Sequence, residues 1–251
     1  MISREILEKL ARQYQTSVFP NVIREYFQHL FLSELYRLPE SERLLFKGGT
    51  ALRIIYGSPR FSEDLDFSLS GGPRGTAAAF IEGLFLRVLA QIEKIGIDVE
   101  LNEKSGATSG GYFGAATLKL LDYQPVRAQI NVSSRGAREV HGEVDSVTND
   151  FVPTYTLTHL SQEELVEEKV FGALVERKKP RDFYDLYFMM RKRMLSAAQK
   201  RKLAKVKERI VADAQKINLK AELRAFLPTD QQAIIRDFLR ALEAELERQI
   251  I

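Results

Sequence analysis

Residues 44–69 read LLFKGGTALRIIYGSPRFSEDLDFSL, and this stretch predicts two strands joined by a turn and a short helix. The apolar run Leu44–Phe46 has the length of a buried strand. Gly48-Gly49 interrupts the run, and apolar residues at helical spacing follow it over 51–55. In residues 64–69 apolar and polar side chains alternate, which is the pattern of a strand with one buried face. The rest of the fold is expected to be organised around this unit.

The turn of this stretch has the features of a phosphate-binding loop. Gly48 and Gly49 lack a Cβ, so backbone can approach a ligand closely there. Thr50 is expected to cap the helix that follows. Unpaired N–H groups at a helix start favour an anion such as phosphate. A Gly-Gly-Thr turn without any ligand is the common alternative.

The second strand carries a candidate metal site. Leu65 and Phe67 are expected to face the core, which places Asp64 and Asp66 together on the opposite face. Two adjacent carboxylates repel each other, and a hard cation with oxygen ligands such as Mg²⁺ relieves that repulsion. A solvated strand face is the alternative. A phosphate-binding turn followed by a paired-carboxylate metal site is the minimal equipment for moving a nucleotidyl group.

Composition limits the function classes. The 251 residues suffice for one large domain or two small ones, and they include no Cys, which excludes disulfides, Cys-ligated zinc and a thiol nucleophile. No signal peptide or long apolar run is found, so we expect a cytoplasmic protein. His29, expected in a helix, and His141 and His159, expected at the surface, lack metal-ligand spacing, which argues against a metallohydrolase.

Charge is distributed unevenly along the chain. Residues 1–155 contain 17 basic and 19 acidic side chains, whereas residues 156–251 contain 20 and 15. The stretch 177–209 alone holds 13 basic residues against three acidic ones. Such a stretch suggests a polyanionic partner, although a solvated helix face is an equally simple interpretation.

The remaining periodicity predicts an α+β fold with two parts. An α/β domain over 1–155 and a helical domain over 156–251 are expected. Lys104–Gly111 is interpreted as a mobile linker and 135–155 as an irregular connection. Helices are predicted over 3–15, 20–37, 75–94, from Ser161, from Pro180, near 197–218 and near 230–249, and strands over 97–102, 112–120 and 126–133.

A second group of polar residues lies in the helical half. Lys169 falls on an apolar helix stripe, where it needs a partner or extends outward to solvent. Asp182 and Asp185 are three residues apart and share a helix face, as part of a Lys-x-x-Asp-x-x-Asp pattern that begins at Lys179. Asp182 can also simply complement the helix dipole.

Taken together, these motifs resemble a known family. Lys47-Gly48-Gly49-Thr50-Ala51-Leu52 is followed by Arg60-x-Ser62-x-Asp64-Leu65-Asp66-Phe67, then Glu168-Lys169, then Arg177-x-Lys179-Pro180-Arg181-Asp182-x-Tyr184-Asp185-Leu186. This order is similar to that of the AbiEii-type nucleotidyltransferase toxins of abortive-infection and toxin–antitoxin systems, within the DNA polymerase β-like superfamily. The resemblance implies a polymerase β-like lobe and a helical lobe enclosing a nucleotide cleft, an NTP substrate, and Mg²⁺ as cofactor. It further implies the tRNA 3′ end as acceptor, a block of aminoacylation, and a cognate antitoxin as partner.

The resemblance also implies a role for each motif residue. Lys47, Gly48, Gly49 and Thr50 would hold the triphosphate, supported by Arg60 and Ser62, and Asp64 and Asp66 would ligate Mg²⁺. Lys169 would contact the phosphates, and Asp185 with Asp182 would complete the polar cleft and help to activate the acceptor hydroxyl. In-line nucleotidyl transfer needs such neutralisation of phosphate charge.

One departure from the superfamily pattern keeps other functions open. Many polymerase β-like enzymes place a third carboxylate on a later strand, but the polar face of 127–133 offers Arg127, Gln129 and Asn131 and no acid, with Gln129 taken as the position of the missing acid. A protein or small-molecule acceptor is one alternative, and a degenerate chain that only binds nucleotide or a partner is another.

Overall fold

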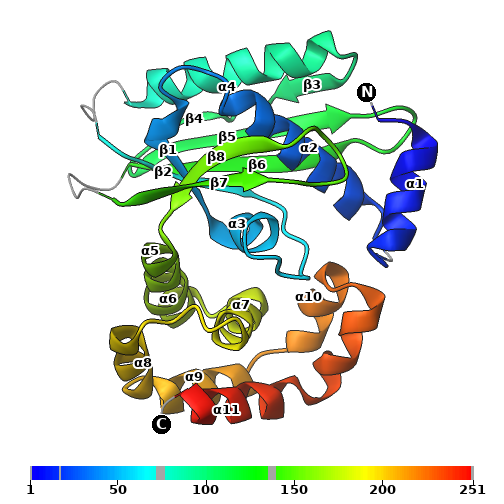
Figure 1. Ribbon diagram of the computed structural model, residues 1–251. Coiled ribbons are helices and arrows are strands. Elements are labelled where there is room, and N and C mark those ends of the chain that lie inside the picture. The colour runs from blue at the N-terminus through cyan, green and yellow to red at the C-terminus, as the bar shows by residue number, and fades with distance from the viewer. Residues whose placement is uncertain (1, 17, 72–76, 135–139, 250–251) are drawn as a thin grey trace. The chain divides into compact units, whose positions relative to one another are not determined.

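The computed structural model describes residues 2–16, 18–71, 77–134 and 140–249. It divides into two compact units, which we describe separately (Figure 1). The sheet unit comprises Met1–Gly57 and Phe61–Leu160, and the helical unit comprises Ser58–Arg60 and Ser161–Ile251. The sheet therefore runs past the boundary expected at residue 155. Among the described residues, no helix has the length and apolar character needed to span a bilayer.

The sheet unit is built on one mixed eight-stranded sheet. Its order is β3-β5-β6-β2-β1-β8-β7, with β4 paired to β5. The central pair β1–β2 is antiparallel, while β2–β6 and β1–β8 are parallel. The strands are β1 (Leu44–Lys47), β2 (Leu65–Leu69), β3 (Asp98–Leu101), β4 (Gly106–Thr108), β5 (Gly111–Lys119), β6 (Val126–Ser133), β7 (Gly142–Val147) and β8 (Tyr155–Leu160).

Alternation along the strands produces the buried face. Leu65 and Phe67 of β2 are completely buried, and Leu69 packs against the same core, as the period-2 pattern predicts. On β6 the apolar positions 126, 128, 130 and 132 are buried, while Arg127 and Gln129 are exposed. The predicted polar face of this strand is therefore confirmed.

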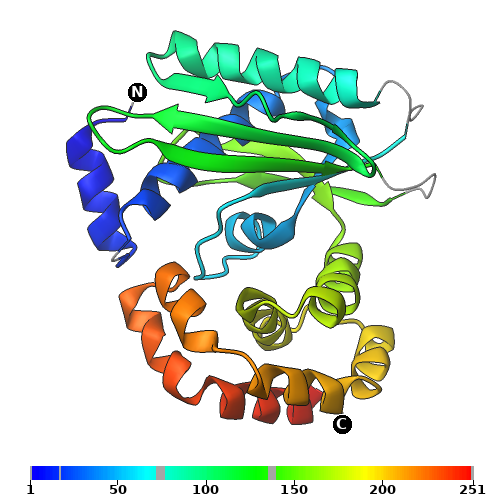
Figure 2. The ribbon, with the colours of Figure 1, turned by 180° about the vertical axis from the view of Figure 1, so that it is seen from behind.

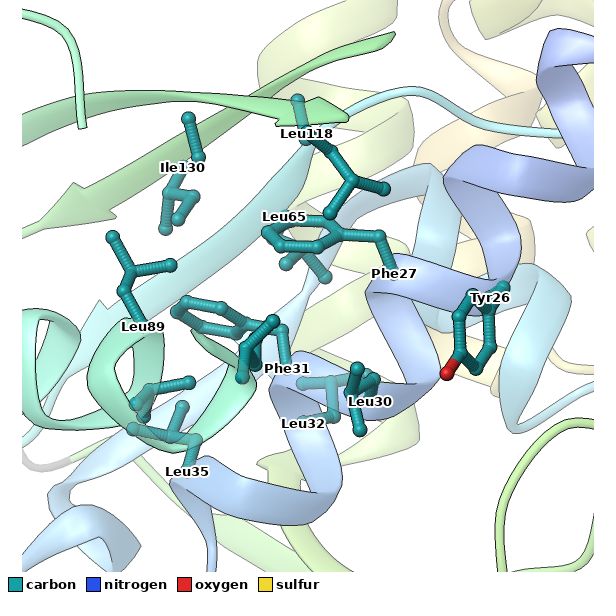
Figure 3. Packing of buried hydrophobic residues seen from close by; sticks show 14 of the residues in the cluster. Tyr26, Phe27, Leu30, Phe31, Leu32, Leu35, Leu65, Leu89, Leu118 and Ile130 are labelled. Carbon is teal, nitrogen blue, oxygen red and sulfur yellow. The ribbon is translucent and has the colours of Figure 1, made fainter. Parts of the chain in front are cut away.

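Helices α2 (Pro20–Leu35) and α4 (Ala77–Lys94) supply the other half of the core. Their apolar side chains gather against the sheet, as Figure 3 shows for Phe27, Phe31 and Leu89 beside Leu65. The rings of Phe31 and Phe85 lie 5.4 Å apart, edge to face. The unit also contains α1 (Arg4–Gln13), the 3₁₀ turn η1 (Ser41–Arg43) and α3 (Gly48–Ile54). Figure 2 shows α2 and α4 from the opposite side.

Two predictions for this half are wrong. The expected mobile linker contains β4, which forms a hairpin with β5. Gly111 at φ +150° allows β5 to lie close to β6, because a Cβ there would lie 1.8 Å from the Val132 carbonyl oxygen. The expected irregular connection over 135–155 contains β7 and the first residue of β8, and its residues 135–139 lie outside the described part. Strand β7 is exposed on both faces up to Ser146, so it shows no apolar alternation. Its pairing with β8 depends on backbone hydrogen bonds instead.

The helical unit begins where the sequence predicts. Ser161 caps α5 by accepting a hydrogen bond from the Glu164 backbone N–H (3.4 Å). Lys178 at φ +53° ends α6, and Pro180 opens α7. The regions expected as single helices near 197–218 and 230–249 are each broken into two elements. The elements are α5 (Gln162–Val166), the π-helical η3 (Glu167–Leu174), α6 (Val175–Arg177), α7 (Pro180–Arg191), α8 (Ala197–Ala204), α9 (Lys207–Gln215), α10 (Leu219–Phe226), the 3₁₀ segment η4 (Thr229–Asp237) and α11 (Phe238–Gln249).

Candidate functional site

The glycine turn and the carboxylate of the first motif are in direct contact in the sheet unit. Lys47, the last residue of β1, pairs in register with Asp66 of β2, and the chain turns into α3 at Gly48. Gly48 has φ +86°, and a Cβ at this position would lie 2.3 Å from Oδ2 of Asp66. Only glycine fits, because both its backbone angle and the space beside the carboxylate exclude a side chain.

Thr50 does not cap α3, contrary to the sequence prediction. The helix begins at Gly48 with Lys47 as its N-cap, so Thr50 lies within the first turn. Its side chain is completely buried, and its hydroxyl donates a hydrogen bond to the Asp64 carbonyl oxygen. Thr50 therefore links α3 to the residue that leads into β2.

Asn131 lies beside Asp66, on the polar face of β6 where a third carboxylate was sought in the sequence. The two residues pair in register across β2 and β6, and Nδ2 of Asn131 donates to Oδ1 of Asp66 at 3.0 Å. Gln129, taken from the sequence as that position, is exposed, and it is Ile130 that pairs with Leu65. The assignment of Gln129 is therefore corrected to Asn131.

The chain that leads into the Asp pair is held by α2. The Gln28 side chain is buried and donates to the carbonyl oxygens of Ser62 (3.0 Å) and Glu63 (3.2 Å). Arg24, one turn earlier, lies 3.6 Å from the Glu63 carboxylate. Gln28 was missed by sequence reasoning. The available signal was a glutamine in the middle of an apolar helix, since a buried amide needs hydrogen-bond partners.

In the helical unit, three motif residues form one buried ion cluster. Arg60 donates to Asp185 through Nε (3.0 Å to Oδ1) and Nη2 (2.8 and 3.0 Å to the two oxygens). Nζ of Lys169 donates to Oδ2 of Asp185 at 2.8 Å. Arg60 is 2% exposed and Asp185 1%, so water contributes little to their solvation. Three motif segments that are distant in sequence therefore meet at one carboxylate.

The cluster fixes the charge state of Asp185. Burial by itself would raise the pKa of this carboxyl group, but the charges of Arg60 and Lys169 outweigh it and hold the pKa below its ordinary value. Asp185 is therefore an anion that accepts hydrogen bonds on both oxygens. Lys169 is supplied by the π-helical segment η3, and π-helical turns occur frequently at functional sites.

Asp182 acts at the start of α7. Its carboxylate accepts hydrogen bonds from Arg177 (Nη2, 2.6 Å; Nε, 3.2 Å) and from the Lys179 backbone N–H (3.2 Å). Asp182 is 2% exposed. In the structure it thus caps the helix and pairs with a preceding arginine, which matches the simpler of the two sequence interpretations.

The histidines take no part in these clusters. His29 is buried in α2, as expected in a helix, with Nδ1 2.9 Å from the Tyr155 hydroxyl. His141 is exposed as predicted. The prediction for His159 is wrong, because it is buried between the Asp145 carboxylate (3.1 Å) and the Leu160 carbonyl oxygen (2.7 Å).

Comparison with known proteins gives the family. The family model described as nucleotidyl transferase AbiEii toxin, type IV toxin–antitoxin system, matches residues 30–249. No curated protein matches the chain. Two crystal structures from Helicobacter pylori resemble it in fold. One, a candidate nucleotidyltransferase, shares 21% identity over 98% of both chains with a TM-score of 0.56. The other, JHP933, shares 21% identity over 99% of this chain and 96% of its own, also with a TM-score of 0.56. The family match covers most of the sequence, and the chain belongs to the AbiEii nucleotidyltransferase toxin family.

Proposed function

We propose that this protein transfers a nucleoside monophosphate from an NTP to a hydroxyl of RNA, with the 3′ end of tRNA as acceptor. Such an addition would block aminoacylation and thereby translation. The observation that carries the proposal is the contact between the glycine turn at Gly48 and the Asp66 carboxylate. A backbone that can approach phosphate and an oxygen ligand for a divalent cation thus lie at one point of the sheet.

The residues at this point suit Mg²⁺. Carboxylate and amide oxygens are hard ligands, and Mg²⁺ is usually held by one or two carboxylates together with water and substrate phosphates. Asp64 and Asp66 would hold the ion. Within the described ranges, no group of three or more His, Asp or Glu side chains has the arrangement of a metal site. When bound, Mg²⁺ would neutralise charge on the transferring phosphate and the leaving pyrophosphate.

The chain's own residues would bind and orient the reactants. Lys47, Gly48, Gly49 and Thr50 are assigned to the triphosphate, and Ser62 supports the approach to Asp64. In the reaction the acceptor hydroxyl oxygen forms a bond to the α-phosphorus and its proton passes to solvent water, while the bond from that phosphorus to the bridging oxygen breaks and pyrophosphate leaves.

Lys169 and Asp185 have different roles in this scheme. Lys169 is assigned to the phosphates, and Asp185, which already accepts from Arg60 and Lys169, positions that ammonium group. Its lowered pKa makes Asp185 a poor base, so we assign it no proton transfer. Arg60 and Asp182 support the same part of the helical unit and are not assigned a direct contact with the nucleotide.

A transfer assay tests the proposal. Wild-type protein and Asp66→Ala are incubated with total tRNA, Mg²⁺ and each labelled NTP in turn, and RNA and protein are resolved separately. We expect the wild type to label tRNA at its 3′ end, and Asp66→Ala to lose at least about 100-fold in rate, because catalytic electrostatics of this kind are worth several kcal/mol. Asp98→Ala, an exposed acid on β3 of the same sheet, is the control and should retain activity.

The assay also separates the alternatives. Label on protein instead of RNA would show a different acceptor for the same chemistry. Nucleotide binding in calorimetry without turnover would identify a chain that only binds. Labelling of tRNA by Asp66→Ala at the wild-type rate would refute the metal-site assignment. The family also implies a cognate antitoxin as partner, and co-expression that suppresses the transfer would identify it.

A further inference from the structure

The basic stretch of the helical unit separates into two classes of side chain. Several cations between residues 177 and 209 are in ion pairs with acids of the same unit. The pairs with their N–O distances are Arg177–Asp182 (2.6 Å), Lys178–Asp213 (3.0 Å), Arg181–Glu222 (2.6 Å), Arg191–Glu245 (3.9 Å), Lys207–Glu247 (3.8 Å) and Arg209–Asp213 (3.7 Å), and Lys202 pairs with Glu167. The charges of these side chains are therefore balanced within the unit.

A second class of cations lacks such partners. Lys192, Arg193, Lys200, Arg201 and Lys205 have no acidic partner among the described residues. Lys192 only approaches the Phe188 ring, 5.9 Å from its centroid. All five lie between residues 192 and 205, a segment with no Asp or Glu. We call these five residues the α8 basic surface.

Helix α8 directs its cations outward. Gln199 and Leu203 are buried, and the Gln199 side chain donates to the Glu163 carbonyl oxygen (2.8 Å), which fixes the helix against α5. Arg201 and Lys205, four residues apart, are exposed on a common side of this element. Their position in the last turn and at the C-cap suits the helix dipole, and their exposure leaves both side chains available to a ligand.

We propose that the α8 basic surface binds the phosphate backbone of the RNA acceptor. This inference rests on the proposed function, because it names the surface that holds the acceptor of that reaction. Charge complementarity carries it: five Arg and Lys side chains without acidic partners in the described part of the chain, from a segment without Asp or Glu, suit a polyanion. Contacts of this kind carry no sequence information, so they would serve acceptors of many sequences.

The test is RNA binding in the absence of NTP. Fluorescence anisotropy measures the Kd of a labelled tRNA for the wild type and for the triple variant Lys200→Gln/Arg201→Gln/Lys205→Gln. The control, Lys216→Gln/Lys220→Gln/Arg224→Gln, removes the same charge from exposed residues of the same unit, with Lys220 and Arg224 also four residues apart. Circular dichroism and urea unfolding verify that both variants fold.

The two variants are expected to differ. The α8 variant should bind tRNA at least about tenfold more weakly at 0.1 M salt, and its slope of log K against log [salt] should fall by about 2, since each lost phosphate contact removes about 0.7–0.9. The control should stay within about threefold of the wild type. Equal weakening of RNA binding in both variants would show that only net charge matters and would contradict a specific role of the α8 basic surface. Unchanged binding by the α8 variant would also contradict it.

This outcome is distinguishable from failure of the proposed function. If the wild type binds tRNA but labels no RNA with any NTP, and the α8 variant binds tRNA more weakly, the proposed transfer fails and the assignment of the surface to RNA stands. If the wild type labels tRNA and the α8 variant binds and labels it equally well, the surface is wrong and the transfer stands.

Discussion

Arg60 donates hydrogen bonds to both carboxylate oxygens of Asp185, and the two side chains are almost completely buried. Replacing Asp185 by Asn removes the buried carboxylate that Arg60 and Lys169 share. We expect the free energy of unfolding to fall by about 3–5 kcal/mol. Urea unfolding of the full chain measures it.

Two controls test the reason for that loss. Arg37→Gln, which breaks the exposed pair with Glu34, should cost less than about 1 kcal/mol. The combined change Arg60→Leu/Asp185→Leu should recover part of the Asp185→Asn loss, because the more deeply buried of the two cations is removed together with the carboxylate. A double variant that is as unstable as the sum of its two single changes would contradict the pairing.

Gly48→Ala should damage the candidate site, whereas Gly83→Ala should not. At Gly48 a methyl group would overlap the Asp66 carboxylate, and φ is +86°. We expect a loss of at least about 2 kcal/mol in stability and of measurable NTP binding. At Gly83, in α4, no atom lies within 4 Å of the added Cβ, so alanine should be neutral or stabilising by up to about 1 kcal/mol. Urea unfolding and calorimetry with NTP and Mg²⁺ distinguish the two sites.

Asn131→Asp should make the protein more dependent on divalent cations. The change replaces the amide that donates to Asp66 by a second carboxylate. Without metal, we expect a loss of about 1–3 kcal/mol from the missing hydrogen bond and the new repulsion. Adding Mg²⁺ should restore more stability in this variant than in the wild type, and none of that extra gain should occur in Asn131→Ala. Thermal unfolding with and without Mg²⁺ provides the comparison, and an equal Mg²⁺ effect in all three proteins would place the cation elsewhere.

Mild acid should destabilise the sheet unit through His29. Burial, helped by the nearby Arg53 charge, lowers the pKa of His29 from 6.5 to about 3. The folded state therefore keeps the imidazole neutral while the unfolded chain takes up a proton. The stability is fully present above pH 6.5 and is lost as the pH falls toward 3, by about 2 kcal/mol at pH 5. Urea unfolding at pH 7 and pH 5 measures this loss, which should be smaller in His29→Gln, a variant without the titrating group.

Sequence periodicity predicts the buried faces of the central strands well, since burial follows from the alternation in residues 64–69 and 126–133. It fails at β7, where the two faces are exposed and the backbone alone makes the pairing. It also fails at Thr50 and Gln129. For Thr50, a capping residue in the sequence does not determine at which residue the helix begins. For Gln129, the polar face of a strand does not determine its register against the neighbouring strand. Register depends on contacts distant in sequence, and only the structure shows that Asn131 is the residue opposite Asp66.

The role of Arg60 shows the same limit. Its motif position suggests phosphate support, but the structure buries it against a carboxylate that lies far along the chain. For Lys169 the apolar stripe allows two outcomes, a buried partner or extension to solvent, and the structure shows the first of these.

The segment Ser58–Arg60 belongs to the helical unit although it lies between two elements of the sheet unit. The helical unit is therefore discontinuous in the amino-acid sequence. A fragment that starts at Ser161 would lack Arg60, leaving Asp185 with Lys169 as its remaining cation from the cluster. Expressing the C-terminal half alone should yield a poorly folded product, and a split version of the protein should regain its structure only when the piece carrying residues 58–60 is supplied in trans.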